Sequence, residues 1–350
     1  MRIAIDASRA GRLNPTGTER YARNVLNALV PIAGHHWLSL YYDRQPADPP
    51  RAPHVEVKVR PFPRLWTHVR LSVEMGRERP DRLFVPAHVV PAVHPPTVVT
   101  IHDLGYLRYR LAYRPAAWIY LFLSTRWSAR VAARIVVDSW ATRRDLLRHT
   151  GVDPAKVEVV HLGVEPRFHP REPAELAEPL ARLGLKPGGY LLFVGTLQPR
   201  KNLPRIMRAH ARAGKDVPPL AIAGAGSLPT TSDRTRLLGY VPDELGPALY
   251  AGARGLVFPT LYEGFGLPLL EAMASGVPVL GGDNSSMPEI VGDAGLLVDA
   301  TDEAAIADGI RRLCGGDSDL KAKGLARARQ FTWERTAAQT LAAIERPMSS

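Results

Sequence analysis

Short runs of β-branched and aliphatic residues alternate with longer helix-like patterns along the whole chain, and this alternation constrains the fold more than any other feature. It is typical of βαβ units, in which parallel strands form a sheet that helices cover. The alternation is interrupted at residues 163–185, where proline and charged residues replace the strand pattern. A chain of 350 residues is also long enough for two domains of ordinary size. The sequence therefore predicts an α/β protein with two doubly wound domains, residues 1–165 and 166–332.

The predicted elements divide between the two halves. In the first half, strands are expected at residues 2–7, 37–42, 55–59, 82–86, 97–101, 135–138 and 157–161, and helices fall between them, including 19–30, 115–132 and 141–149. In the second half, strands are expected at 190–195, 220–224, 236–238, 255–259, 278–281 and 296–298, and helices at 203–213, 241–252, 268–275, 302–313, 317–330 and 333–344. Open α/β sheets bind ligands beyond the carboxyl ends of their strands, so two facing domains would form a cleft and the loops after strands are expected to carry the chemistry.

The positive charge is concentrated in the first half of the chain. The net charge is +11, and residues 1–165 hold 24 basic and 14 acidic residues, whereas residues 166–350 hold 21 and 20. Such asymmetry indicates that one half meets an anionic partner, which would be a nucleic acid, a membrane surface or an acidic ligand. The alternative is an ordinary solvated surface rich in arginine.

Several classes of protein are excluded by composition. A hydrophobic fraction of 45% with mixed charge is typical of a globular chain. The single Cys314 cannot form an internal disulfide, which favours a reducing compartment. No apolar run approaches the ~20 residues that span a bilayer, and the N-terminus passes directly into a strand pattern without a secretion signal. We therefore expect a cytoplasmic protein, and the absence of a Cys/His cluster gives no indication of zinc.

The most informative segment is PTLYEGFGLPLLEAMASGVPVLG, residues 259–281. Pro268 is suited to the first turn of a helix, which places Glu263 in the loop before it and Glu271 about one turn inside. Gly264 and Gly266 allow a ligand close to the backbone at the positive end of that helix. Because two carboxylates would repel a bare phosphate, they are better explained as acceptors for the hydroxyls of a ribose and a second sugar. The alternative is that an acidic residue simply stabilises the helix start.

A second loop, GTLQPRKN, joins the strand that ends near Gly195 to the next helix. It places Arg200 and Lys201 together at the carboxyl end of a strand. This pair can bind a diphosphate and stabilise its charge as the group departs. Exposed loop arginines and lysines are also common without such a role.

Two loops in the first half carry weaker signals. Gly17 and Thr18 lie between the first strand and a helix, where backbone N–H groups could contact a phosphate, although a glycine there also fits a simple turn. His102 follows a buried strand, where it could hydrogen-bond a substrate hydroxyl or carry a proton. Alternatively, His102 or Asp103 caps the loop.

Two other motifs are interpreted as structural. GAGSLP at residues 224–229 resembles a dinucleotide fingerprint, but Pro229 occupies its third glycine position, so dehydrogenase chemistry is not expected. The Asp317–Ser318–Asp319 triplet could be a metal-binding Asp-x-Asp motif, but it opens a helical segment in which aspartate is a natural N-cap.

Together these segments resemble the retaining glycosyltransferases of family 4, which have the GT-B fold. Glu263 and Glu271 match the family's pair of glutamates separated by seven residues, GTLQPRKN its phosphate loop, IHDL at residues 101–104 its histidine segment, and GTERYARNVL its glycine loop. QFTWERTA at residues 330–337 resembles the family's terminal helix. The resemblance covers essentially the whole chain and implies that residues 333–350 cross back onto the first domain.

The resemblance also implies a role for each site residue. Glu271 would bind the ribose, Arg200 and Lys201 the phosphates, and Glu263 with the backbone of Gly264, Phe265, Gly266 and Leu267 the donor sugar and β-phosphate. Tyr240 and Val241 would lie near the base, and Gly17, Thr18 and His102 would complete the donor site from the first domain. Family members need no metal ion or other cofactor. A front-face route is expected, in which the departing phosphate helps to deprotonate the acceptor hydroxyl.

The sequence departs from the family pattern in two places. The glycine loop reads Thr16-Gly17-Thr18 where many relatives have paired glycines, and residues 226–236 leave room only for a loop where relatives often have a helix.

We therefore expect transfer of a hexose from a nucleotide-diphosphate sugar, GDP-mannose ahead of a UDP-sugar, to a hydroxyl of a glycan, a lipid-linked intermediate or an aglycone. Arg108, Arg110 and Arg114 are candidate acceptor-side residues, and the basic first domain suggests peripheral association with an anionic membrane on its cytoplasmic face. The alternatives are a non-catalytic subunit that binds a sugar nucleotide and a basic nucleic-acid-binding protein. No aromatic stripe of the kind that contacts bases supports the latter, so no nucleic-acid partner is expected.

Overall fold

The computed structural model describes residues 1–12, 17–226, 234–316 and 318–347, and the chain divides into two compact units. Unit 1 comprises Met1–Gly163 and Thr332–Ser350, and unit 2 comprises Val164–Phe331. The first division falls two residues before the predicted one, and the chain returns to unit 1 one residue earlier than predicted. Within the described residues, no helix combines the length and the apolar content that crossing a membrane requires.

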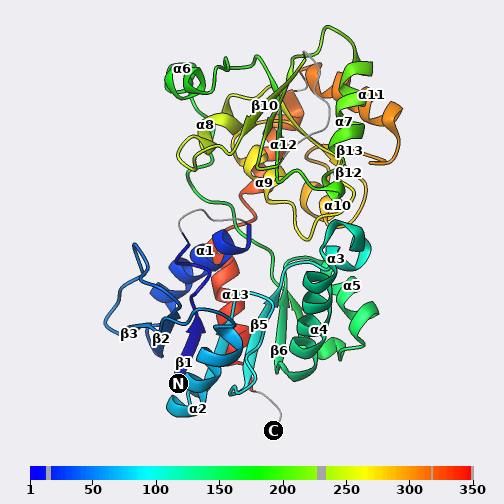
Figure 1. Cartoon of the computed structure of the whole chain (residues 1–350). Helices are drawn as coiled ribbons and strands as arrows, with labels where there is room; N and C mark the ends of the chain where they lie inside the picture. The colour runs from blue at the N-terminus through cyan, green and yellow to red at the C-terminus, as the bar shows by residue number, and fades with distance from the viewer. Residues whose placement is uncertain (13–16, 227–233, 317, 348–350) are drawn as a thin grey trace. The chain divides into compact units, whose positions relative to one another are not determined.

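Unit 1 is built on a seven-stranded parallel sheet of order β3-β2-β1-β4-β5-β6-β7 (Figure 1). Its strands are β1 (Arg2–Asp6), β2 (Trp37–Tyr42), β3 (Val55–Val59), β4 (Arg82–Val85), β5 (Thr97–Ile101), β6 (Arg134–Val137) and β7 (Val157–Val159). Its helices are α1 (Gly17–Ile32), η1 (Thr67–Leu71), α2 (Ser72–Glu78), α3 (Gly105–Arg108), η2 (Arg110–Ala112), α4 (Pro115–Val131), α5 (Trp140–Thr150), η3 (Pro154–Lys156) and α13 (Trp333–Glu345). Helices α1 and α13 pack against each other, and α2, α4 and α5 contribute to the core on the other face of the sheet.

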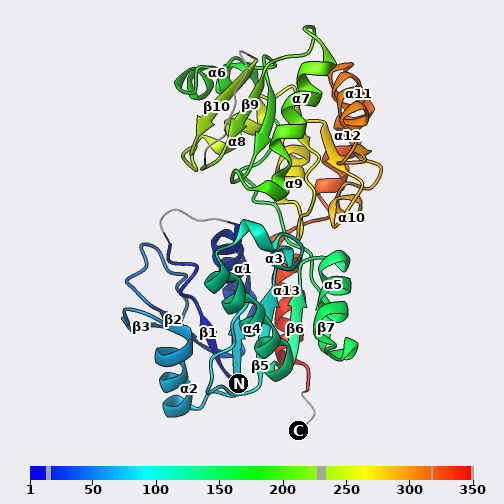
Figure 2. The same ribbon diagram turned by 45° about the vertical axis from the view of Figure 1, so that its right-hand side comes forward.

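Unit 2 is a six-stranded parallel sheet of order β10-β9-β8-β11-β12-β13 (Figure 2). Its strands are β8 (Leu191–Val194), β9 (Leu220–Ala223), β10 (Thr235–Gly239), β11 (Gly255–Phe258), β12 (Val279–Gly282) and β13 (Leu296–Val298). Its helices are α6 (Pro173–Arg182), η4 (Pro199–Lys201), α7 (Leu203–Ala213), α8 (Gly246–Ala251), α9 (Leu267–Ala274), α10 (Met287–Val291), α11 (Glu303–Cys314) and α12 (Ser318–Ala328). Both units are doubly wound, as predicted, because each strand order reverses once, at β1/β4 and at β8/β11.

The last helix belongs to unit 1, as the sequence resemblance implied. A hydroxyl on α13, that of Thr336, donates to the carbonyl of His161 at 2.7 Å, and Thr332 caps the helix start. Gly163 lies so close to this segment that an added Cβ would be 2.2 Å from the backbone nitrogen of Trp333. Glycine is therefore required where the two parts of the chain in unit 1 touch.

The predicted strands are all present, with ends that shift by at most two residues, whereas the helical predictions for the second half missed α6 and α10 and misplaced the start of α8. Helix α6 lies in the segment interpreted as a linker, where Glu172 and Glu175 form a capping box and Pro173 occupies the first turn. Helix α8 begins at Gly246 and not at residue 241, which keeps Pro247 in the first turn where its missing N–H is tolerated.

Candidate active site

The predicted cationic loop and the predicted glutamate loop meet at one edge of the unit 2 sheet. Strands β8 and β11 pair directly at the point where the strand order reverses. The loop after β8 carries Arg200 and Lys201, and the loop after β11 carries Glu263. Ligands of open α/β sheets bind at such a reversal, so the topology places these three side chains where a ligand is expected.

The loop after β8 is fixed by a short turn and by one asparagine. Asn202 has a left-handed backbone, φ +61°, and its side-chain amide donates to the carbonyls of Pro259 at 3.0 Å and Ala300 at 2.6 Å. The backbone N–H of Leu261 donates to the carbonyl of Arg200 at 2.8 Å. These bonds hold the cationic turn η4 against the segment that follows β11.

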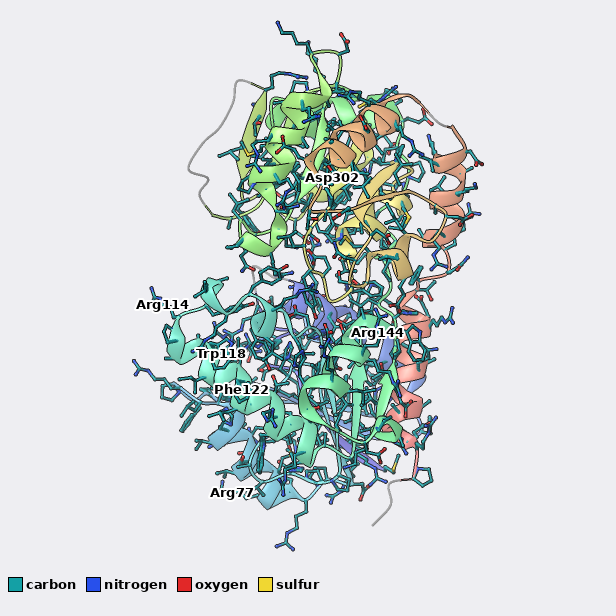
Figure 3. All side chains as sticks on the ribbon, turned by 90° about the vertical axis from the view of Figure 1, so that its right-hand side faces the viewer. Arg77, Arg114, Trp118, Phe122, Arg144 and Asp302 are labelled. Atoms are coloured by element: carbon teal, nitrogen blue, oxygen red, sulfur yellow. The ribbon has the colours of Figure 1, made fainter. Side chains whose placement is uncertain are left out.

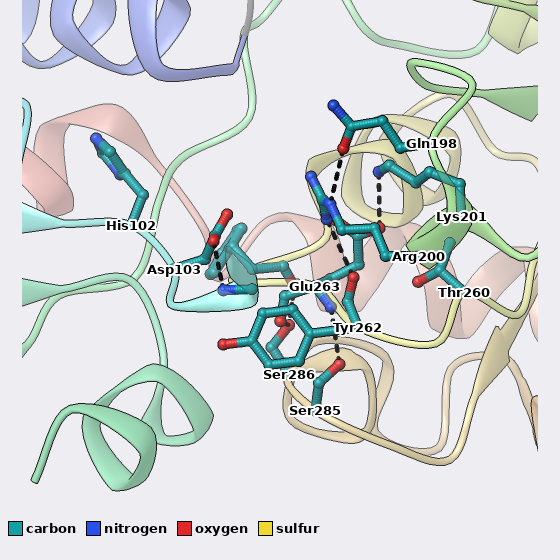
Figure 4. A network of polar contacts seen from close by, with 12 residues as sticks. His102, Asp103, Gln198, Arg200, Lys201, Thr260, Tyr262, Glu263, Ser285 and Ser286 are labelled. Atoms are coloured by element: carbon teal, nitrogen blue, oxygen red, sulfur yellow. Dashed lines mark hydrogen bonds and ion pairs between the residues drawn. The ribbon is translucent and has the colours of Figure 1, made fainter. Parts of the chain in front are cut away.

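Arg200, Lys201 and Glu263 form one ion-paired cluster (Figure 4). The Lys201 ammonium lies 2.7 Å from Glu263 Oε1, and Arg200 Nη1 lies 3.3 Å from Glu263 Oε2. Arg200 Nη1 also donates to the carbonyl of Tyr262 at 3.1 Å. Lys201 and Glu263 are 6% and 7% exposed, so this is a buried pair. Two fixed cations against one carboxylate leave one net positive charge, which suits the binding of an anion.

The glutamate loop is held in turn by the loop after the next strand, β12. The Ser285 hydroxyl accepts from the backbone N–H of Glu263 at 3.0 Å, and the Ser286 hydroxyl donates to the carbonyl of Phe265 at 2.7 Å. Gly266, with φ +107°, is the N-cap residue directly before α9. The sequence interpretation missed both serines, although their position after a neighbouring parallel strand was a usable signal.

The other predicted donor residues lie in the same unit. Glu271 is buried, 5% exposed, in the second turn of α9, and Leu267 begins this helix. Tyr240 and Val241 follow β10, the edge strand two places from β8, and Tyr240 is 58% exposed. The predicted donor-binding residues of unit 2 thus lie at or near the carboxyl edge of one sheet. Among these described residues, Tyr240 forms no hydrogen bond to Arg200, Lys201 or Glu263.

In unit 1, His102 is held at the carboxyl end of β5 by partners on both ring nitrogens. Nδ1 lies 2.8 Å from Asp138 Oδ2, and Nε2 lies 3.0 Å from the carbonyl of Pro86. Burial opposes a charge on the ring, but the Asp138 carboxylate and the Pro86 carbonyl outweigh it and raise the pKa of His102. Since both partners accept hydrogen bonds, the geometry favours the doubly protonated ring.

A second histidine faces the first, and sequence interpretation missed it. His88 has a left-handed backbone, φ +41°, and its ring lies 5.3 Å from that of His102, edge to face. Its Nδ1 is buried without a hydrogen-bond partner in the described structure. Burial first, and the neighbouring His102 second, lower the pKa of His88 to about 4. A non-glycine residue in this backbone region stores strain, which often marks a functional site.

The remaining predicted residues of unit 1 lie on its surface. Gly17 begins α1 and has open space where a Cβ would be, so packing does not require glycine there. Thr18 follows it, whereas Thr16 lies outside the described residues. The three predicted acceptor-side arginines are exposed on and between α3, η2 and the start of α4: Arg108, Arg110 and Arg114.

The motifs interpreted as structural have structural partners. An added Cβ at Gly224 would lie 1.9 Å from the carbonyl oxygen of Gly195, so glycine allows two loops to touch, and Pro229 lies outside the described residues. Asp319 pairs with Lys323 at 2.8 Å along α12, and Asp317 also lies outside the described residues. Among the described residues, the cluster with metal-ligand geometry is His35, His36 and Glu345, away from the strand ends discussed above.

Comparison with protein families and solved structures gives consistent results. The family described as Glycosyltransferase Family 4 matches residues 15–168, and that described as Glycosyl transferases group 1 matches residues 188–315. O-antigen chain mannosyltransferase B of Escherichia coli is 36% identical over 266 residues, which are 71% of this chain and 70% of that protein.

Solved structures share the fold over nearly the whole chain. WaaG, a glycosyltransferase involved in lipopolysaccharide biosynthesis, aligns with a TM-score of 0.76 and 16% identity over 99% of this chain and 100% of that one. HepE of Anabaena, solved in complex with UDP and glucose, aligns with a TM-score of 0.73 and 16% identity over 98% and 100%. The two doubly wound units are thus those of the GT-B fold, and the chain is an enzyme that belongs to the family 4, group 1 glycosyltransferases.

Proposed function

We propose that this enzyme transfers a hexose, mannose ahead of other sugars, from a nucleotide-diphosphate donor to an acceptor hydroxyl with retention of configuration. The observation that carries the proposal is the buried Arg200–Lys201–Glu263 cluster at the strand reversal of unit 2. The similarity to an O-antigen mannosyltransferase supports mannose, and UDP bound to a protein of the same fold supports a nucleotide donor. GDP-mannose is the donor that we put first, followed by UDP-sugars.

In the proposed donor complex, Arg200 and Lys201 bind the diphosphate. Glu263 fixes both cations and, with the backbone of residues 264–267, contacts the sugar, while Glu271 accepts from the ribose. Tyr240 and Val241 lie beside the base. The two cations stabilise the charge that develops on the leaving diphosphate, the task that a divalent metal performs in other transferases, so we expect no metal requirement.

Retention follows from a front-face displacement. The bond between the anomeric carbon and the phosphate oxygen breaks, and the acceptor oxygen bonds to the same face of that carbon. The acceptor proton passes to the departing phosphate, so the protein supplies no nucleophile. Electrostatic stabilisation by Arg200 and Lys201 is then the main catalytic contribution of unit 2.

From unit 1, we propose that Gly17 and Thr18 contact a phosphate and that His102 donates a hydrogen bond to a hydroxyl of the donor sugar. The raised pKa of His102 favours a hydrogen-bond donor over a general base. For this contact, Nε2 exchanges its bond to the Pro86 carbonyl for a bond to the substrate.

In this proposal the basic unit 1 binds the acceptor, which is a glycan, a lipid-linked intermediate or an aglycone. Arg108, Arg110 and Arg114 contact it. We further propose that unit 1 associates peripherally with an anionic membrane on its cytoplasmic face, because the first half of the chain carries almost all of the net charge.

The test is turnover of a donor panel by the wild type and by Glu263→Ala, Arg200→Ala and Glu271→Ala. Loss of one phosphate or ribose contact should reduce kcat/KM by about tenfold or more, because each is worth at least about 1.4 kcal/mol in the transition state. Arg208→Ala is the matched control, since Arg208 lies on α7 and forms an exposed ion pair with Glu303 of α11. Chelation by EDTA should leave turnover unchanged, and wild-type rates in all three site variants would refute the assignment.

A further inference from the structure

Helix α4 of unit 1 packs Trp118, Leu121 and Phe122 against the core, but it also leaves several large apolar side chains exposed on its other side. Its fully buried positions are small or polar: Ser124, Thr125, Ser128 and Ala129. Its large apolar residues Ile119, Tyr120, Leu123 and Trp127 are 50%, 45%, 59% and 42% exposed. Leu123 lies three or four residues from each of the other three, so the four share one side of the helix, which we call the α4 face. A surface helix normally turns such residues toward the core, so the α4 face indicates an apolar partner.

The inward side of α4 is anchored by specific bonds, so the helix is not free to turn over. The buried Ser128 hydroxyl accepts from the backbone N–H of Val90 at 2.9 Å. At the border of the α4 face, the half-exposed Trp127 donates its indole N–H to the Val90 carbonyl at 3.1 Å. Trp118 stacks on Phe122 at 5.2 Å, and its indole donates to the carbonyl of Tyr106 at 3.0 Å (Figure 3). The exposure of the α4 face therefore follows from how the helix is fixed.

Exposed apolar residues of neighbouring elements extend this surface. Tyr120 contacts His68 of η1, with the phenol oxygen 3.0 Å from Nε2. Val69 and Val73, one turn apart on η1 and α2, are 43% and 40% exposed. Val93, 53% exposed, lies beside the same helix, because its backbone N–H donates to Ser72 Oγ at 3.3 Å. The apolar surface thus spans more than one helix.

The charged residues of the segment that contains α4 are all basic. Residues 104–137 contain six arginines and no acidic residue. Within the part of the chain that the structure describes, Arg108, Arg110, Arg114, Arg126 and Arg130 form no ion pair with a carboxylate. Arg110 lies over the ring of Trp118 at 4.5 Å and Arg126 over that of Phe122 at 5.2 Å. These cations border an apolar surface and are available to an anionic partner.

Apolar side chains bordered by unpaired arginines match the interface of an anionic lipid bilayer. The apolar residues would enter the region between headgroups and acyl chains, while the arginines contact lipid phosphates. A second copy of the chain fits less well, because a symmetric interface would bring two sets of arginines face to face. We propose that the α4 face, with Val69, Val73 and Val93 beside it, is the surface by which unit 1 docks on an anionic membrane. This proposal rests on the membrane association proposed above and assigns it to one surface.

The experiment is co-sedimentation of the full chain with vesicles of phosphatidylcholine alone or mixed with phosphatidylglycerol. The wild type should sediment with the mixed vesicles and much less with phosphatidylcholine, and high salt should weaken binding. The Ile119→Gln/Leu123→Gln variant should bind at least about tenfold more weakly, because the apolar contribution is lost. Both residues are exposed, so folding should be retained. Leu237→Gln is the control, since Leu237 is a similarly exposed leucine in unit 2, 41% exposed.

The outcomes separate this proposal from the proposed reaction. Donor turnover with a soluble acceptor is measured on the same samples, and loss of turnover with intact vesicle binding would count against the reaction alone. Equal vesicle binding by the wild type and the Ile119→Gln/Leu123→Gln variant would overturn the assignment of the surface. Failure of the wild type to sediment would overturn both the surface and the membrane association, whereas turnover would still test the reaction. A dimer in sedimentation velocity that the variant disperses, without vesicle binding, would show that the α4 face meets a second copy.

Discussion

The two units each place a buried carboxylate at the carboxyl edge of a parallel sheet, but they neutralise it in different ways. In unit 2, Glu263 is paired with Arg200 and Lys201, whose charges are permanent at ordinary pH. In unit 1, Asp138 is paired with His102, whose charge depends on pH, and His88 faces that pair. The first arrangement keeps a constant positive charge for an anionic leaving group, whereas the second couples the site to the proton concentration.

The largest effect on stability is expected when Lys201 is replaced, because Lys201 is one of the two cations that pair with Glu263 in unit 2. Lys201→Met should lower the free energy of unfolding of unit 2 by about 3 kcal/mol, because Glu263 loses its shortest ion pair while remaining buried. The double variant Lys201→Met/Glu263→Gln removes the carboxylate charge, which in the single variant keeps only its longer contact to Arg200, and should recover most of that loss. Urea denaturation of the three proteins measures both effects.

Lys215→Met provides the control for this cycle, since Lys215 is an exposed lysine in unit 2. If the double variant were no more stable than Lys201→Met, the cost would not come from the loss of the Lys201–Glu263 pair, and that ion pair would not be what holds the cluster.

An intermediate effect is expected at His88 and tests whether unit 1 is sensitive to pH. The pKa of His88 is about 4 in the folded protein and 6.5 in the unfolded chain. The unfolded chain therefore takes up this proton first, so the contribution of His88 to the free energy of unfolding is complete above pH 6.5 and is lost as the pH falls toward 4. Lowering the pH from 7 to 5 should therefore cost about 2 kcal/mol in the wild type through this group. His88→Asn, which tolerates the left-handed backbone, should remove that dependence.

His102 contributes to the pH dependence of stability with the opposite sign. Its raised pKa gives stability that is present below pH 6.5 and is lost as the pH rises through the pKa of the folded state. The comparison of the wild type with His88→Asn isolates the His88 contribution, and an identical acid dependence in the two proteins would contradict the burial of an uncharged His88.

The smallest effect is expected at Asp138. Asp138→Asn keeps the shape of the side chain but removes the charge that raises the pKa of His102, so burial should then lower that pKa. In a plot of kcat/KM against pH, the alkaline limb should move to lower pH by at least about one unit. A pKa shift of that size corresponds to about 1.4 kcal/mol. An unchanged profile would mean that the protonated His102 takes no part in turnover, whereas Arg200→Ala should reduce the rate without moving the profile.

The sequence predicted most of the fold because strands and sheet edges follow local rules. Apolar runs of three to six residues identified the strands found in the described residues. The rule that parallel strands end at one edge placed Arg200, Lys201 and Glu263 near a ligand site. Prediction failed at α6, because Pro173 and Glu172 resemble a linker until the capping box and the burial of Leu176 and Leu180 are seen.

The mutual contacts of side chains were not predictable in the same way. From the sequence, Glu263 was assigned to a sugar and Lys201 to a phosphate, and no contact between them was predicted. In the structure the two side chains pair at 2.7 Å, although they are 62 positions apart in the sequence. The pairing of His102 with Asp138 and the strained His88 depend likewise on how loops after neighbouring strands are packed.

By itself, the sequence determined two doubly wound domains, a net charge confined to the first half, and the family of glycosyltransferases to which the chain belongs. The tertiary structure alone decided which charges neutralise each other and that α4 presents its apolar residues to solvent. The physical reason is that periodicity and propensity act over a few residues, whereas burial, ion pairing and the face a helix exposes depend on partners brought together by folding.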